Sequence, residues 1–349
     1  MTQFDEEQDD EFEQTRYESK QASSSSKQPP QTSHLSPSSL VAGTLSGAFT
    51  HTLTHPLDSV KIRIQAAGRG QKYTGGNFGV NQTLTTTRDI LRNEGVRALY
   101  QGLSSSILGS SISWGLYFFM YDSSKNYFQK HGFVARDGQI TGLGLIMSSL
   151  NAGVVTCLVT HPIWLIKTRL QLQQRGVVIS GQPVYKGTID AAWKIATTEG
   201  IGRGLYVGLA PSLCLISHGA IHFVCYDLLK QYYIQNFKST LIDNDQRLNG
   251  LESLVLAGGA KSFAALVTYP LQVIKTRLQD VKNKTAVGEA RYSGMWDAVK
   301  KMYRVEGPGT FFRGIIPHTL KVTPSGAITF AIYEMLQNFL RNMDGQEAE

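Results

Sequence analysis

The 349-residue chain carries 34 lysine and arginine residues against 27 aspartate and glutamate residues, which gives a net charge of +7 at neutral pH. Such an excess suits a nucleic-acid partner or an anionic membrane surface. Because the basic residues are dispersed and no zinc or RNA-recognition signature accompanies them, we exclude nucleic acid. The sequence also shows no nucleophile-base set, phosphate loop or metal-ligand spacing, so we expect neither an enzyme nor a metal site.

The N-terminal segment differs in composition from the rest of the chain. Its first twenty residues hold eight acidic and two basic side chains, and residues 21–39 are rich in Ser, Gln and Pro. Such a segment cannot bury a core, so we expect residues 1–37 to be a disordered, acidic and Ser/Gln-rich tail. It is too acidic for a matrix transit peptide and lacks the apolar centre of a secretory signal, so any organellar address is internal.

A unit of similar sequence then occurs three times. Its prolines, Pro56, Pro162 and Pro270, lie 106 and 108 residues apart, and each begins a Pro-x-x-x-x-Lys-x-Arg segment. Downstream of each proline follow a Tyr-x-Gly, an acidic residue before Gly, and an aromatic-x-Gly, always in this order. Four landmarks kept in order three times predict tandem repeats. We place the repeats at residues 38–130, 138–235 and 248–341.

Each repeat contains two stretches of mostly apolar and small residues, each of about the twenty residues that cross a bilayer. An amphipathic segment between them, such as Gln82–Asn93 or Ala191–Thr198, predicts a short surface helix. We therefore expect an all-α membrane protein with six transmembrane helices in three tandem two-helix repeats. The six stretches are Leu40–His55, Ser104–Tyr121, Gly144–His161, Leu209–Tyr226, Leu254–Tyr269 and Ile315–Tyr333.

The proline motif also predicts which side chains turn inward. A proline inside a helix removes one backbone hydrogen bond and kinks the helix, and residues three apart share a face. The paired residues that we expect to point into the pore are Asp58 with Lys61, Trp164 with Lys167, and Gln272 with Lys275.

Other polar and aromatic side chains within the spans are candidate solute contacts. An ionisable residue in a span is costly unless it is hydrated or paired, so Lys261, which shares a face with Gln272, is expected to point into a water-filled cavity. Trp114 and Tyr117 place aromatic surface on the second span, suited to stacking a planar ring. His218 lies on the fourth span, where we expect a hydrogen bond rather than a metal.

The Pro-x-Asp-x-x-Lys-x-Arg pattern at Pro56–Arg63, repeated with six spans, resembles the mitochondrial carrier family over residues 38–341. The resemblance implies a bundle with pseudo-threefold symmetry, short matrix-side helices and alternating access to one central site. It also implies a multi-pass monomer in the mitochondrial inner membrane with both termini in the intermembrane space, the peroxisomal membrane being the second choice. Membrane lipid, with cardiolipin at the matrix-side helices, is the expected lipid partner.

In that family the motif residues pair between helices and close the matrix side. Two of the three acids are replaced here, so Gln272 is expected to offer a hydrogen bond and Trp164 a cation–π contact of about 0.5 to 1 kcal/mol. The implied pairs are Asp58 with Lys167, Trp164 with Lys275, and Gln272 with Lys61. The implied bracing residues beneath these pairs are Gln65, Gln171 and Gln279.

A second set of residues closes the cytoplasmic side in the family. It follows an aromatic-acid-x-x-base pattern, which the second and fourth spans fit fully, whereas the sixth ends in Gln337. The implied pairs are Asp122 with Lys230, Glu334 with Lys125, and Asp227 with Gln337. A ligand drives such a switch only through its differential affinity for the two states.

The solute follows from further resemblances. Ser113–Tyr121, Ser217–Ala220 and Lys321–Pro324 are similar to the folate and FAD carriers, and Lys321 matches the family's third substrate contact point, although those relatives carry Arg there. Neither Lys261 nor Lys321 has an obvious acidic partner, so we expect an anionic, ring-containing solute of the FAD or folate type, carried as cargo and not as a prosthetic group. Pro162–Leu172 equally resembles pyrimidine-nucleotide and NAD carriers, which stay as alternatives. A non-transporting membrane adaptor is the alternative from another class.

Overall fold

The computed structural model describes residues 37–68, 79–134, 140–174, 184–238, 250–280 and 292–346. It divides into two compact units, one of residues 1–45 and 333–349 and the other of residues 46–332. The first unit includes the beginning of α2 (Pro37–Ala66) and the end of α13 (Ile315–Gln346). The second contains the contacts described below. The predicted tail at residues 1–37 lies outside the described residues except for Pro37.

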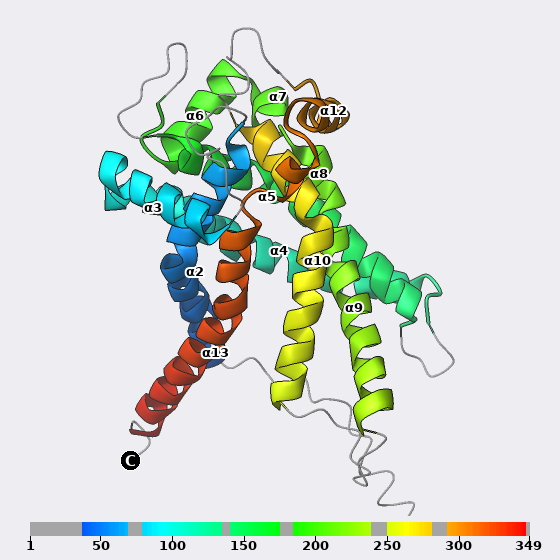
Figure 1. Ribbon diagram of the computed structural model, residues 1–349. Helices are drawn as coiled ribbons and strands as arrows, with labels where there is room; N and C mark the ends of the chain where they lie inside the picture. Colours follow the sequence, from blue (N-terminus) through cyan, green and yellow to red (C-terminus); the bar gives the residue numbers. More distant parts are fainter. Residues whose placement is uncertain are drawn as a thin grey trace, which may run out of the picture. The chain divides into compact units, whose positions relative to one another are not determined.

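The regular elements of the described chain are helical, and the one β contact there is an isolated bridge between Val134 and Ile140. The prolines of the three repeats lie inside α2, α5 (Gly142–Leu172) and α10 (Gly250–Gln279), as the motif predicts. The other long segments are α4 (Leu103–Lys130) and α8 (Leu209–Cys214), which is continued by α9 (Ser217–Tyr233) and η2 (Ile234–Lys238). Neighbouring long helices pack along each other, α4 on α5 and α9 on α10 (Figure 1).

Several large apolar side chains remain exposed along these long helices. Phe119 is 64 % exposed and Phe223 is 73 % exposed. A soluble protein rarely leaves such extensive apolar surface uncovered, so lipid is its natural cover. By length and hydropathy alone, two described segments suffice to cross a membrane, Gly142–Leu172 and Leu209–Asn236.

The predicted surface helices are present in each repeat. They are α3 (Val80–Glu94), α6 (Thr188–Thr198) and α12 (Met295–Glu306), each followed by a short helix, η1 (Val96–Tyr100), α7 (Ile201–Leu205) or η3 (Pro308–Phe312). Each surface helix buries an apolar residue against the last turns of the proline-containing helix of its repeat. Ile90 packs with Val60 and Ile64, and Met302 with Val273 and Ile274. The periodic apolar residues of these segments thus form three small cores at equivalent positions.

The residue before each proline fastens its helix to the start of the next long helix. The side chain donates a hydrogen bond to a backbone carbonyl just before the glycine of the aromatic-x-Gly, and its ring stacks on the aromatic residue. The bonds run from His55 to Gln101 O (3.0 Å), from His161 to Val207 O (3.1 Å) and from Tyr269 to Arg313 O (3.0 Å). The stacked partners are Tyr100, Tyr206 and Phe312.

The glycine of each aromatic-x-Gly begins a close contact with another repeat. Gly102, Gly208 and Gly314 have positive φ values of 78°, 78° and 81°. A Cβ on Gly102 would lie 3.1 Å from Lys167 O, and one on Gly314 would lie 3.2 Å from Lys61 O. Glycine is therefore required here both by the left-handed backbone and by the close approach.

Each repeat contains an ion pair between an arginine and a glutamate, which was not predicted from the sequence. Each guanidinium donates two hydrogen bonds to one carboxylate, Arg63 to Glu94, Arg169 to Glu199, and Arg277 to Glu306. Burial raises the pKa of Glu306, but the hydrogen bonds and charges of Arg277 and Arg313 outweigh it and hold that pKa below its usual value. The signal was present in the sequence, since the arginine and the acidic-Gly pair recur in all three repeats.

Two of these arginines also reach another repeat. Arg63 Nε donates to Gln171 O at 3.0 Å, and Arg277 Nε donates to Gln65 O at 2.6 Å. In contrast, the buried Nε of Arg169 has no hydrogen-bond partner in the part of the chain that the structure describes. The repeats are therefore alike within themselves but unequally joined.

Candidate functional site

The motif lysines surround a cavity of about 320 Å³ between the proline-containing helices. All six residues predicted to face the pore line it, and His218 from α9 joins them. The predicted inward face of each motif is therefore confirmed. The six are Asp58, Lys61, Trp164, Lys167, Gln272 and Lys275.

Asp58 connects two lysines across the cavity. Its Oδ2 accepts from Lys167 Nζ at 2.6 Å, and its Oδ1 accepts from Lys321 Nζ at 2.8 Å. The first contact confirms the expected pair. The second corrects the expectation that Lys321 lacks an acidic partner, because α13 brings it to a carboxylate 263 residues away in the chain.

Lys61 binds two neutral acceptors. Its Nζ donates to Gln272 Oε1 at 3.0 Å, which is the predicted contact, and to His318 Nδ1 at 2.9 Å. His318 was not among the residues predicted from the sequence. Neither acceptor carries a charge, so Lys61 is hydrogen-bonded, whereas Lys167 and Lys321 are ion-paired.

Trp164 does not contact the lysine that we expected. Its indole N–H donates to Ser113 Oγ at 3.2 Å, and the Lys167 amine lies 5.2 Å from its ring centroid. The predicted cation–π contact with Lys275 is therefore wrong for this structure. The indole leans toward α4 because Gly109 leaves room there: a Cβ on Gly109 would lie 3.4 Å from Trp164 Cε2.

The charges of this cluster are unequal. Lys167 and Lys321 share the one carboxylate of Asp58, and Lys61 and Lys275 line the same cavity as Asp58. In a low-dielectric surrounding such an excess of positive charge attracts an anion strongly. The arrangement can hold an anionic solute, and the described residues around it offer no set suited to covalent catalysis.

The family model described as mitochondrial carrier protein matches the chain three times, over residues 33–132, 139–237 and 246–344. The chain belongs to the mitochondrial carrier family. Its relatives are named as transporters and not as enzymes, in agreement with the prediction from the motifs.

Three relatives show the branch of the family that the carrier resembles. It is 36% identical to the chloroplastic nicotinamide adenine dinucleotide transporter 1 of Arabidopsis thaliana, over 86% of this chain and 90% of the relative. It is 38% identical to the chloroplastic folate transporter 1 of the same plant, over 86% and 94%. It is also 29% identical to a mitochondrial FAD carrier protein of Saccharomyces cerevisiae, over 86% and 96%.

The three glutamines of the carrier's motifs bind across repeats. Gln65 donates to the Tyr269 hydroxyl at 3.1 Å, Gln171 to Ser59 Oγ at 3.3 Å, and Gln279 to Val207 O at 3.4 Å. These bonds do not include the lysines of the cavity. The bracing role of the glutamines therefore stays a proposal.

Four residues of the cytoplasmic set, Asp122, Lys125, Asp227 and Lys230, lie in the second unit. Asp122 and Asp227 are exposed, Asp227 accepts from Gln231 at 2.9 Å, and no ion pair joins Asp122 to Lys230 in the described chain. The expected Asp122–Lys230 pair is thus not formed in this structure, whereas the Asp58–Lys167 pair is. Glu334 belongs to the other unit and the side chain of Gln337 lies outside the described residues, so the pairs Glu334–Lys125 and Asp227–Gln337 stay predictions.

The predicted solute contacts divide into two groups. His218 lines the cavity and hydrogen-bonds Thr268 Oγ1 at 3.0 Å, and Lys321 reaches Asp58. Lys261, Trp114 and Tyr117 do not line this cavity. Lys261 is exposed, and Trp114 is 62 % exposed and stacks on Phe118 at 5.6 Å, so its ring has a free face.

No group of three or more His, Cys, Asp or Glu side chains in the described residues is placed to hold a metal ion.

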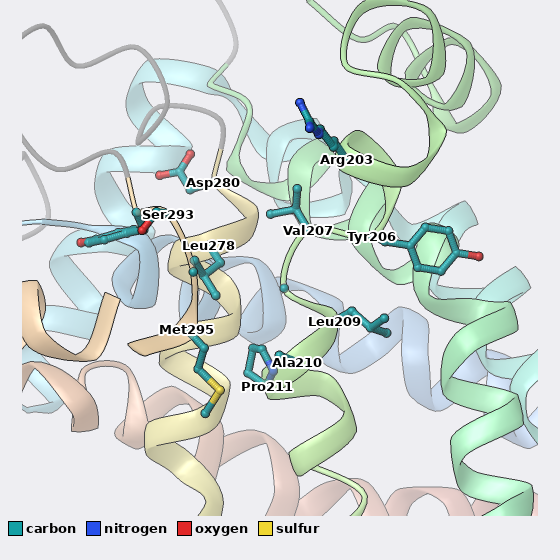
Figure 2. A pocket seen from close by; sticks show the side chains of 13 residues that line it. Arg203, Tyr206, Val207, Leu209, Ala210, Pro211, Leu278, Asp280, Ser293 and Met295 are labelled. Carbon is teal, nitrogen blue, oxygen red and sulfur yellow. The ribbon is translucent and has the colours of Figure 1, made fainter. Parts of the chain in front are cut away.

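A second pocket, of about 480 Å³, lies between the segment from Arg203 to Pro211 and the segments around Leu278 and Met295 (Figure 2). It therefore lies where repeats 2 and 3 meet, and Arg203 and Asp280 supply its charges.

Proposed function

We propose that the chain is an alternating-access transporter of an anionic, ring-containing cofactor of the FAD or folate type. The observation that carries the proposal is the excess of lysine over acid: Lys61, Lys167 and Lys275 line the central cavity, a fourth lysine, Lys321, reaches it, and Asp58 is the one carboxylate in its lining. Buried positive charge without enough acidic partners is costly in a membrane, and an anionic solute relieves that cost.

The choice of cofactor rests on charge, shape and relatives. FAD and NAD carry phosphates, folate carries carboxylates, and each has a flat ring that the exposed face of Trp114 can stack. The relatives support NAD as well as folate or FAD, and none of the residues in the cavity separates the three. We therefore keep NAD as an equal alternative and a pyrimidine nucleotide as a further one.

The proposal includes the place and assembly of the carrier. We propose the mitochondrial inner membrane with both termini in the intermembrane space, because the relatives include mitochondrial carriers. We propose a monomer, since the three repeats supply each other's partners. We also propose that the pocket in Figure 2 takes a lipid headgroup of the cardiolipin type, supported by Arg203 and by the N-terminus of α12, which Gly294 caps.

Uptake by purified full-length carrier in liposomes tests the function. We expect saturable uptake of labelled FAD, folate or NAD. Lys321→Gln should greatly reduce this uptake, because it removes one of the two positive charges paired with Asp58. The matched control is Lys194→Gln, since Lys194 pairs with Asp190 on the exposed surface of α6.

Two outcomes would contradict the proposal in different ways. Uptake of uridine triphosphate without any of the three cofactors would assign the carrier to a nucleotide. Uptake of none of these solutes would favour a non-transporting adaptor.

A further inference from the structure

The three motif lysines occupy equivalent positions but differ in their partners. Lys167 is paired with Asp58, and Lys61 is bonded to Gln272 and His318. In the described part of the chain, the amine of Lys275 makes no ion pair and no hydrogen bond, although the residue lines the cavity. The ionisable groups that interact electrostatically with this amine are another lysine, Lys167, and the thiol of Cys157.

Lys275 lacks an acidic partner because of the residue at the equivalent position of the preceding repeat. Asp58 in repeat 1 pairs with Lys167 in repeat 2, so the equivalent partner of Lys275 in repeat 3 is Trp164 in repeat 2. That side chain has neither a carboxylate nor a free polar atom to offer. Its N–H is bonded to Ser113, and its ring lies by Lys167.

A lysine in this position needs a counter-charge from outside the chain. Its amine is a strong, compact donor that binds phosphate or carboxylate oxygens as a point charge. The cavity of about 320 Å³ is at the small end of ligand sites, so it admits one end of a cofactor and not the whole molecule.

We propose that Lys275 binds the phosphate or carboxylate of the transported cofactor, which thereby takes the place of the acid that the matrix-side gate lacks at Trp164. This inference rests on the proposed function and specifies where the anionic end of the solute sits. The solute then makes a contact at the gate that the empty carrier lacks, which gives it the differential affinity that a switch requires.

Substitution of Lys275 tests the inference in liposomes with the cofactor that the wild-type carrier takes up. We expect Lys275→Gln to raise KM about tenfold to a hundredfold, the factor for losing a charge-assisted hydrogen bond. Lys275→Arg keeps the charge and is expected to lose less. Lys194→Gln, far from the cavity on α6, is expected to keep the wild-type KM. Binding is read separately as the rise in melting temperature on adding FAD, folate or NAD, which Lys275→Gln should abolish.

Trp164→Asp gives a second test that keeps Lys275 in place. A carboxylate at residue 164 would neutralise Lys275 and compete with the solute, so we expect KM to rise as it does in Lys275→Gln. Were Lys275 only a gate residue, the restored pair would slow turnover and leave KM unchanged. This variant carries the test if Lys275→Gln does not fold.

The outcomes separate the two claims. A wild-type carrier that takes up none of the cofactors contradicts the proposed function, and the inference falls with it. A wild-type carrier that transports a cofactor, with KM in Lys275→Gln or Trp164→Asp within about twofold of the wild-type value, overturns the inference alone.

Discussion

Asp58 is the residue on which the charge of the cavity depends. Its two oxygens hold Lys167 and Lys321, and its side chain is almost fully buried. Removing one partner from a buried ion pair leaves an uncompensated charge and costs about 3 to 5 kcal/mol. The carrier therefore has one negative charge whose loss nothing in the described cavity can replace.

At this scale we predict that Asp58→Asn lowers the melting temperature of the purified carrier and removes most of its solute uptake. Asp58→Glu keeps the charge on a longer side chain and is expected to retain part of both. Thermal melting and liposome uptake measure the two effects. Wild-type melting and uptake in Asp58→Asn would show that Lys167 and Lys321 do not need this carboxylate.

Part of the cavity was predictable because the motif fixes it locally. Three-residue spacing placed Asp58 and Lys61 on one face, and the resemblance to the carrier family implied Lys167 as the partner of Asp58. The bond from Lys321 to Asp58 was not predictable, because it depends on how α13 lies against α2 and not on any spacing in the chain. The orientation of Trp164 was missed for a similar reason: it is set by the space at Gly109 on another helix.

At the scale of elements, the joints between helices rely on glycine. Gly102 starts α4 with a positive φ, and its Cα faces the carbonyl of Lys167 so closely that a methyl group would lie 3.1 Å from that oxygen. The left-handed conformation alone costs an alanine about 1 to 2 kcal/mol. The crowding adds to this cost, because a backbone oxygen in α5 cannot move without moving the helix.

We therefore expect Gly102→Ala to lower the melting temperature of the detergent-purified carrier. Gly219→Ala is the matched control, since Gly219 lies within α9 without a positive φ and a methyl group there would meet nothing within 4 Å. Alanine in a helix is favoured over glycine by about 1 kcal/mol, so this control should be neutral or slightly stabilising. Equal melting temperatures for the two variants would refute the predicted joint.

The helices themselves were largely predictable, and their boundaries were less so. The apolar stretches and the amphipathic segments indicated the long helices and the surface helices α3 and α6. The break between α8 and α9 at residues 215–216 was not predicted, because Ser217 continues an apolar, helix-compatible stretch. The short helices after the surface helices also went unpredicted, since five residues give too little periodicity.

At the scale of the whole molecule, the three repeats are joined unequally. Arg63 and Arg277 each bind a carbonyl of another repeat, whereas the Nε of Arg169 has no acceptor among the described residues. Lysine keeps the positive charge at these positions but cannot reproduce the guanidinium fork.

We predict that Arg63→Lys and Arg277→Lys destabilise the carrier more than Arg169→Lys does. The difference should be about 1.5 to 3 kcal/mol, the contribution of a hydrogen bond made by a charged group. Melting temperatures of the three variants under identical conditions provide the measurement, and Arg169→Lys serves as the internal control. An equal loss in all three would mean that the repeats are joined alike.

The pairing of groups between repeats has a consequence for the origin of the chain. In a single copy of the unit, the lysine would lack its acid and the arginine would lack its carbonyl acceptor, because both partners belong to another copy. Three identical subunits assembled within the lipid would satisfy those groups by symmetry. In one fused chain each copy can differ from the others, so a tryptophan and a glutamine can stand where a strict trimer would repeat the aspartate.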